Sequence, residues 1–282
     1  MVGVLGVSAS AILVRFSQAP SGVTAAYRLG WTVLLLLPVV LLRCRAELRR
    51  VTARDLVLCG ASGVLLALHF LTWFESLKRT SVASSTVLVS TEVIFTALGF
   101  ALFLHGKIPR LGVWAILLAF GGSALLALSG GGGAGELSGN LLALAAASAA
   151  AVYTLIGRIQ RGHLSTTVYT FLTYLACFLT LLLGTAAAGT PLTGYGGREW
   201  LIGLALAVQC TLLGHSLFSW CLKYLSPSYV SAAKLCEPVF SSLAAIPLFG
   251  EVPGPLQLAG GAAVLGAVLL YTWAEREKTP AG

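Results

Sequence analysis

Charged residues are scarce in this chain of 282 residues. They make up 10% of the sequence, against about 25% in an ordinary soluble domain, and aspartate occurs once, at Asp55. Apolar residues make up 57%. A soluble core cannot bury that much apolar surface, whereas lipid can cover it. The composition therefore excludes an ordinary soluble domain and predicts an all-α membrane protein.

Side chains that could carry metal or redox chemistry are few and badly spaced. The six cysteines form no CxxC pair, and five lie in apolar segments, where we expect small buried hydrophobic residues. The chain has no HxxxH or HxxxxD motif. We therefore expect no cofactor, no metal and no enzymatic activity. The net charge of +8 comes from basic residues in short loops, which favours membrane topology over nucleic-acid binding.

Apolar segments long enough to approach a bilayer span follow one another along the chain. The segment 1–14 lacks a basic start, so we expect a span there and not a cleavable signal. In total we predict ten transmembrane helices, at 2–16, 23–42, 56–74, 82–104, 111–128, 140–156, 166–187, 200–222, within 226–255, and at 256–273.

The two halves of the chain resemble each other. LKRTSVASSTVLVSTEVIF (77–95) aligns with LKYLSPSYVSAAKLCEPVF (222–240), and Glu92 falls on Glu237 at an offset of 145 residues. Five spans is an odd number, so the second half must be inverted relative to the first. We expect two inverted five-helix repeats at 1–129 and 140–273, a Gly-rich linker at 130–139 and a polar cytoplasmic tail at 274–282.

Basic residues are unevenly distributed between the predicted loops. With the N-terminus inside, twelve lysines and arginines fall on the inside and five on the outside. The loop 43–54 alone holds five arginines. Because basic loops stay on the cytoplasmic side, we expect both termini in the cytoplasm. The protein itself is expected in the cell inner membrane.

Two ionisable residues interrupt the ninth predicted span. Lys234 and Glu237 are three residues apart, which would put them on one helix face, and Pro238 is expected to kink the helix. An ionisable residue inside a bilayer costs about 2.5–3.5 kcal/mol, so such residues face a bundle interior or a cavity. The sequence leaves open whether the two form a structural ion pair or a site for substrate or ion.

Glu92 lies in the middle of the fourth predicted span. Its own helix has no basic residue within a turn, so we expect Glu92 to be the better proton carrier. We expect Lys234 to keep Glu237 ionised, in a role in binding or structure. Arg28 is a candidate ion-pair partner for Glu92, because buried charges need pairs.

The stretch CEPVFSSLAAIPLFGEVPGPLQLAGGAAVLGAVLL, together with SASAILVRFSQAP and ESLKRTSVASSTVL, resembles the drug/metabolite transporter (DMT) superfamily, in particular its EamA-like members. The resemblance covers essentially the whole chain. It implies ten helices in two inverted repeats and the export or exchange of small metabolites.

A cavity between the repeats would be lined by aromatic and ionisable side chains. Such a set suits a zwitterion such as an amino acid, with lysine on its carboxylate and a glutamate on its ammonium. Trp73 and Trp220 could instead belong to interfacial belts, and the histidines could join helices by hydrogen bonds. The candidate binding residues are His69, Trp73, Glu92, Tyr153, His215, Trp220, Lys234 and Glu237.

We therefore expect a secondary transporter for small metabolites, with amino acids or similar amphipathic solutes as candidates. It would work by alternating access around a midplane cavity. The expected partners are a small-molecule substrate, the lipid bilayer and candidate coupling protons, but no nucleic acid. Monomer and homodimer both stay open. The alternative is a channel or facilitator without ion coupling, which two inverted halves in one chain disfavour.

Overall fold

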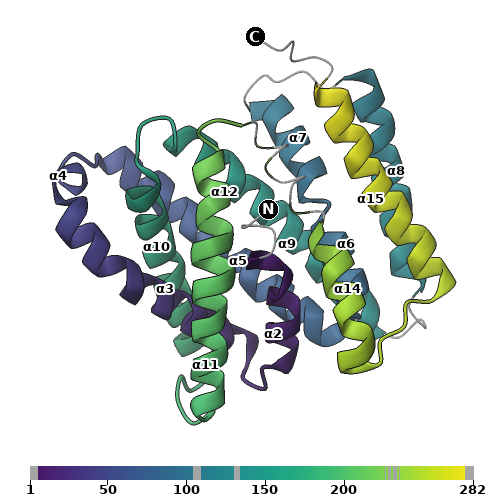
Figure 1. Cartoon of the computed structure of the whole chain (residues 1–282), viewed down its shortest axis with the longest axis horizontal. Helices are drawn as coiled ribbons and strands as arrows, with labels where there is room; N and C mark the ends of the chain where they lie inside the picture. Colours follow the sequence, from purple (N-terminus) through teal and green to yellow (C-terminus); the bar gives the residue numbers. More distant parts are fainter. Residues whose placement is uncertain are drawn as a thin grey trace.

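The computed structural model describes residues 6–103, 109–129, 134–225 and 236–276, together with residues 227, 230 and 234. These residues are largely helical and contain no strand (Figure 1). Among them, seven helices are long and apolar enough to cross a membrane, and three shorter apolar helices accompany them. The prediction of an all-helical membrane protein is confirmed. The ten-span arrangement in two inverted repeats remains a prediction.

The helices are joined mostly by short connections. Their bounds are α2 Ser10–Phe16, α3 Ser21–Arg43, α4 Arg45–Leu48, α5 Ala53–Arg79, α6 Val82–Val89, α7 Glu92–Phe103, α8 Arg110–Ser129, α9 Ala134–Gln160, α10 Thr166–Ala187, α11 Gly197–Ala205, the π-helix η1 Leu206–His215, α12 Ser216–Cys221, α14 Cys236–Phe249 and α15 Pro255–Arg276.

Two segments predicted to be irregular are partly helical. α9 begins at Ala134, so most of the expected linker 130–139 belongs to a helix, and the four residues before it lie outside the described part. α15 continues to Arg276, so the expected tail 274–282 also begins as helix, and its remainder lies outside the described part. Alanine, glutamate, leucine and arginine in these extensions favour the helical state.

Side-chain caps determine where several helices begin. The Thr52 hydroxyl accepts a hydrogen bond from the Asp55 backbone N–H, and the Asp55 carboxylate accepts one from the Thr52 backbone, a reciprocal capping box for α5. Ser81 and Ser165 cap α6 and α10 with their hydroxyls. Each cap satisfies backbone donors that the helix itself leaves unpaired.

Helices from the two halves of the chain pack directly against each other. α5 contacts α9, and α10 contacts α3 and α5. α8 and α15 run side by side at one edge of the bundle (Figure 1). They meet at Gly122 and Gly260, where a Cβ on either residue would lie 2.9 Å from the carbonyl oxygen of the other. Small residues of this kind permit the close approach of membrane helices.

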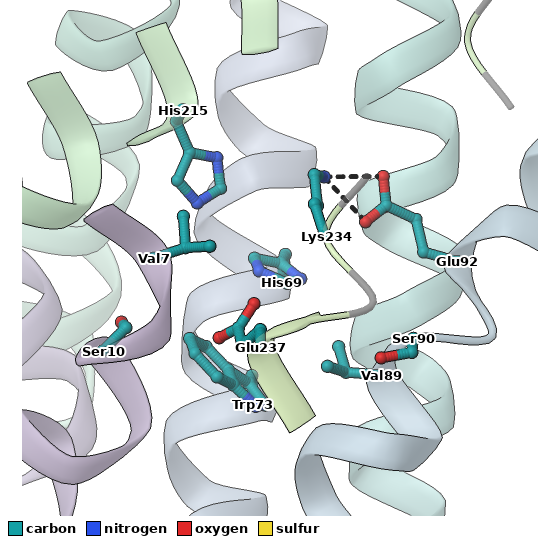
Figure 2. Close-up of a pocket in the computed structure, with 10 residues that line it drawn as sticks. All are labelled: Val7, Ser10, His69, Trp73, Val89, Ser90, Glu92, His215, Lys234 and Glu237. Carbon is teal, nitrogen blue, oxygen red and sulfur yellow. Dashed lines mark hydrogen bonds and ion pairs between the residues drawn. The ribbon is translucent and has the colours of Figure 1, made fainter. Parts of the chain in front are cut away.

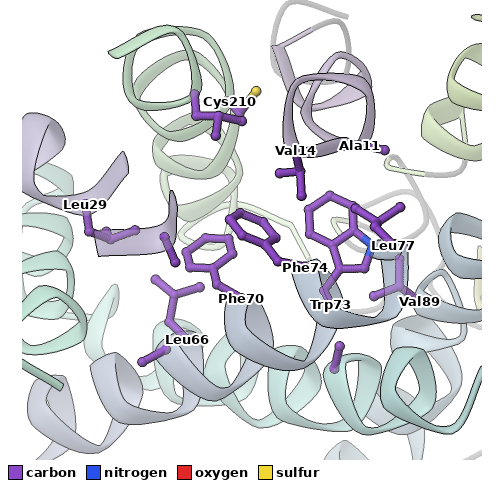
Figure 3. Close-up of a cluster of buried hydrophobic side chains, with 14 of the residues drawn as sticks. Ala11, Val14, Leu29, Leu66, Phe70, Trp73, Phe74, Leu77, Val89 and Cys210 are labelled. Carbon is purple, nitrogen blue, oxygen red and sulfur yellow. The ribbon is translucent and has the colours of Figure 1, made fainter. Parts of the chain in front are cut away.

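The largest apolar cluster surrounds α5. Phe70, Trp73 and Phe74 pack with Val14 of α2 and Leu29 of α3 (Figure 3).

Large apolar side chains are also exposed along α3, α8 and α15, while arginine, glutamate and many hydroxyl groups are buried. An apolar exterior around a polar interior suits a protein surrounded by lipid and not by water.

Candidate functional site

The glutamates at equivalent positions of the sequence repeat both lie among the first described residues of a helix. The first-half span Val82–Phe103 is divided into α6 and α7, and Glu92 is the first residue of α7. In the second half, α14 begins at Cys236, one residue before Glu237. Interrupted membrane helices supply helix N-termini inside the bilayer, as at the binding sites of transporters. A carboxylate is stabilised at such an N-terminus.

A third irregularity lies in the span Gly197–Cys221. Its central segment, Leu206–His215, is π-helical. π-helical turns are rare in proteins, and those that occur are often found at functional sites. This one ends at His215, whose side chain borders the cavity described next.

A cavity of about 40 Å³ lies between α2, α5, α7, α14 and the end of η1 (Figure 2). Its volume suffices for about three water molecules. Six of the eight predicted binding residues line it. The lining consists of Val7, Ser10, His69, Trp73, Val89, Ser90, Glu92, His215, Lys234 and Glu237.

Lys234 pairs with Glu92 at this cavity. Its Nζ lies 2.9 and 3.0 Å from the two Glu92 carboxylate oxygens, and the Thr154 hydroxyl donates to Glu92 Oε1 at 2.9 Å. Glu92, and not Glu237, is the partner of Lys234. α14 is described from Cys236, and Leu235 lies outside the described residues, so the shared helix face of Lys234 and Glu237 stays a prediction.

Glu237 lacks a comparable partner. It is 8% exposed, and its Oε1 makes no hydrogen bond within the described residues. Figure 2 shows its carboxylate directed into the cavity between His69 and Trp73. Pro238 is the third described residue of α14. Leu235 and most residues before it lie outside the described part, so the kink at Pro238 stays a prediction.

The two histidines and Trp73 form an aromatic wall. The rings of His69 and His215 lie 6.3 Å apart, and Trp73 stacks on His69 at 5.8 Å. His69 Nδ1 is 3.0 Å from the Ala146 carbonyl oxygen. Because a carbonyl oxygen only accepts, Nδ1 carries the proton, and Nε2 of the neutral ring is an acceptor.

Arg28 does not form the expected pair with Glu92. Its fully buried guanidinium donates to Thr211 at 2.7 Å and to Ser10 at 3.2 Å, and lies 4.2 Å from the centre of the Phe70 ring. Glu92 is held by lysine instead. Within the described residues, Arg28 therefore bonds to the cavity lining through the Ser10 hydroxyl.

Tyr153 and Trp220 lie outside the cavity lining, contrary to expectation. Tyr153 is buried behind His215, with ring centres 6.4 Å apart, and its hydroxyl is 3.2 Å from Ser219 Oγ. Trp220 is 48% exposed and contacts the ring of Tyr224 at 5.0 Å. Its exposure fits the interfacial alternative. The sequence indicates the helix that carries each residue but not the side that it faces.

Four lining residues were missed by the sequence analysis: Val7, Ser10, Val89 and Ser90. The serines are small polar residues in apolar segments, a signal shared with many other serines of this chain. Val89 carries a more specific signal, because it is the repeat counterpart of Lys234 at the same offset of 145 residues.

A second ion pair joins the ends of α2 and α14. Arg15 lies 2.7 Å from Glu251 and also donates to the backbone carbonyls of Leu77 and Thr80. Glu251 accepts from the Val82 backbone N–H at 2.7 Å. These contacts connect α2, the α5–α6 turn and the segment after α14.

The fold and the cavity define a helical integral membrane protein with a buried polar site between helices of both halves. Among the described residues, no group of three or more His, Cys, Asp or Glu side chains could hold a metal ion. The model of the EamA-like transporter family matches the chain in two stretches, 1–128 and 137–273. The chain belongs to this family of transporters.

Curated relatives include the pseudopaline exporter CntI of Pseudomonas aeruginosa, 24% identical over 73% of this chain and 72% of that protein. The probable terminal-alkyne amino-acid exporter of Streptantibioticus cattleyicolor is 27% identical over 79% of this chain and 75% of its own. The uncharacterized transporter YwfM of Bacillus subtilis is 29% identical over 78% of this chain and 74% of that protein.

A solved crystal structure has a similar fold. It matches with a TM-score of 0.68 over 96% of this chain and 94% of its own, at 18% sequence identity. At that identity, the likeness concerns the fold alone.

Proposed function

We propose that this protein is a secondary transporter that exports or exchanges small metabolites, with amino acids and similar amphipathic solutes as candidates. One observation carries the proposal. Ionisable and aromatic side chains from both halves of the chain line a buried cavity beside two helix N-termini. Transporters use this arrangement to bind solutes within the membrane.

The two ion pairs support alternating access. Lys234–Glu92 and Arg15–Glu251 each join a residue of the first half to a residue of the second. If one half rocks against the other, such contacts must break on one side and form again later. The cavity of about 40 Å³ fits a narrow conformation between two open ones.

The membrane arrangement follows the same proposal. The constant offset between the halves and the two stretches of family match support two inverted repeats. With the basic loops inside, both termini would lie in the cytoplasm and the protein in the cell inner membrane.

Counterflow in proteoliposomes tests this function. The purified full-length protein is reconstituted with an unlabelled panel of amino acids and amines inside, and labelled solute is added outside, with and without a pH gradient. A carrier accumulates label transiently against its gradient when the same solute is inside. A channel gives equilibration without this overshoot, and protein-free liposomes give the background. If no solute of the panel shows flux that depends on the protein, the proposed transporter function is rejected.

A further inference from the structure

The Glu237 carboxylate is the polar group of the cavity that most needs a ligand. More than nine-tenths of the residue is buried, Oε1 has no hydrogen-bond partner in the described residues, and the group points into the cavity (Figure 2). The positive charges of Lys234 and Arg28 act on Glu237, but neither donates to Oε1, and a buried carboxylate oxygen without a hydrogen bond is disfavoured. A state with a bound ligand can remove that penalty.

The neighbouring cations are already engaged. Lys234 is the one amine among the described lining residues, and it donates to both oxygens of Glu92. Arg28 donates to Thr211 and Ser10 and does not belong to the lining, although its Nη2 has no hydrogen-bond partner among the described residues. The cavity therefore offers an open carboxylate, while its cation is already paired. A ligand carboxylate would have to displace Glu92 from Lys234, whereas a ligand ammonium has an acceptor ready.

The surroundings of Glu237 also suit a cation. His69 Nε2 is an acceptor in the neutral ring, because Nδ1 donates to Ala146. Trp73 also lines the cavity. Its Nε1–H has no hydrogen-bond partner in the described residues, and its indole ring is the aromatic group that attracts cations best. An ammonium group has three donors and no acceptor, which complements these groups.

We propose that Glu237 binds the ammonium group of the transported solute, and that this group, and not a carboxylate, selects the substrate. The inference rests on the proposed transporter function and narrows it to solutes that carry an amine. Simple amines that lack a carboxylate should then bind as well as the corresponding amino acids do.

Two sets of matched probes test this site. Isoamylamine is leucine without its carboxylate, and isocaproate is leucine without its amine. Phenethylamine and hydrocinnamate stand in the same relation to phenylalanine. Each probe is titrated into the purified full-length protein in detergent while the midpoint of thermal unfolding is followed. Ligands that bind the folded state raise this midpoint. We expect the amino acids and the amines to raise it and the two deaminated acids to leave it unchanged.

Variants then assign the effect to one carboxylate. Glu237→Gln should weaken amine binding by about tenfold or more, as expected for a lost charge-assisted hydrogen bond. Glu237→Asp keeps the charge, so it should retain the preference for amines at lower affinity, which also covers the case in which Glu237→Gln fails to fold. Glu136→Gln removes a carboxylate from the start of α9 and should bind like the wild type.

Several results would overturn the ammonium site. They are equal stabilisation by the deaminated acids, unchanged amine binding in Glu237→Gln, and no stabilisation by any amine. The unfolding midpoint could also change with pH in the wild type but not in Glu237→Gln, while no amine changes it. In that case Glu237 binds a proton and no solute amine. Counterflow separates the two proposals. If acids or neutral solutes are transported and amines are not, the transporter function is retained and the ammonium site is rejected. If amines bind but no solute is transported, the ammonium site is retained and the transporter function is rejected.

Discussion

Glu92 and Glu237 occupy equivalent positions in the two halves, yet their surroundings differ. Glu92 is held by Lys234 and Thr154, whereas Glu237 points into the cavity without a hydrogen-bond partner in the described residues. The repeat is asymmetric at both partners of Glu92, because the counterpart of Lys234 is Val89 and that of Thr154 is Ala9. One lysine lines a cavity with two glutamates and pairs with the one from the other half.

This difference separates a structural role from a binding role. An ion pair between the halves stabilises one relative arrangement of them, and the open carboxylate remains for a ligand. The expectation that Glu92 carries a proton rested on the lack of a base near it along its own helix. That observation holds along the helix, but Lys234 reaches Glu92 from the other half of the chain, so it no longer favours Glu92 over Glu237 as the proton carrier.

The largest expected effect comes from removing the lysine. Lys234→Ala leaves Glu92 buried without its charge partner, and we expect a loss of about 3–5 kcal/mol in the free energy of unfolding. Replacing both partners with apolar residues, Lys234→Met with Glu92→Leu, should recover most of it. Unfolding in mixed detergent micelles measures both variants. A Lys234→Ala protein as stable as the wild type would contradict the structural role of the pair.

A smaller effect is expected at the second partner of Glu92. Thr154→Val removes a hydroxyl that donates to Glu92 at 2.9 Å. We expect a loss of about 1–3 kcal/mol in unfolding free energy, with amine binding at Glu237 retained. Thr180→Val is the control, because the Thr180 hydroxyl bonds within its own helix. If both substitutions cost the same, Thr154 contributes nothing specific to Glu92.

The smallest effect on stability is expected at the peripheral ion pair. Arg15 and Glu251 are partly exposed, with side-chain exposures of 29% and 18%, so Arg15→Ala should cost about 1 kcal/mol or less. Access should change more than stability. In a background with the native cysteines replaced by alanine, a membrane-impermeant thiol reagent should label Ser10→Cys faster when Arg15→Ala is present. Equal labelling rates would mean that this contact does not close the cavity.

The sequence predicted much of the fold because a membrane span requires a long apolar segment, which is visible in the amino-acid composition. Continuous apolar segments indicated the helices, and costly ionisable residues within them indicated the site at Glu92, Lys234 and Glu237. Partners could not be predicted, because pairing depends on how the helices of the two halves pack. Lys234 reaches Glu92 of the other half, and the spacing along one segment does not contain that contact. The side on which Trp220 lies is likewise a matter of packing.

A comparison of Glu92→Gln with Glu237→Gln tests the division of roles most directly. Each substitution replaces a carboxylate with an amide of similar shape at an equivalent repeat position. The free energy of unfolding of both purified variants is measured against the wild type, without added solute. We expect Glu92→Gln to be clearly destabilised, because Lys234 loses its charge partner, and Glu237→Gln to be as stable as the wild type or more stable, because a buried carboxylate without a hydrogen-bond partner is removed. Equal losses in the two variants, or a larger loss in Glu237→Gln, would contradict the account.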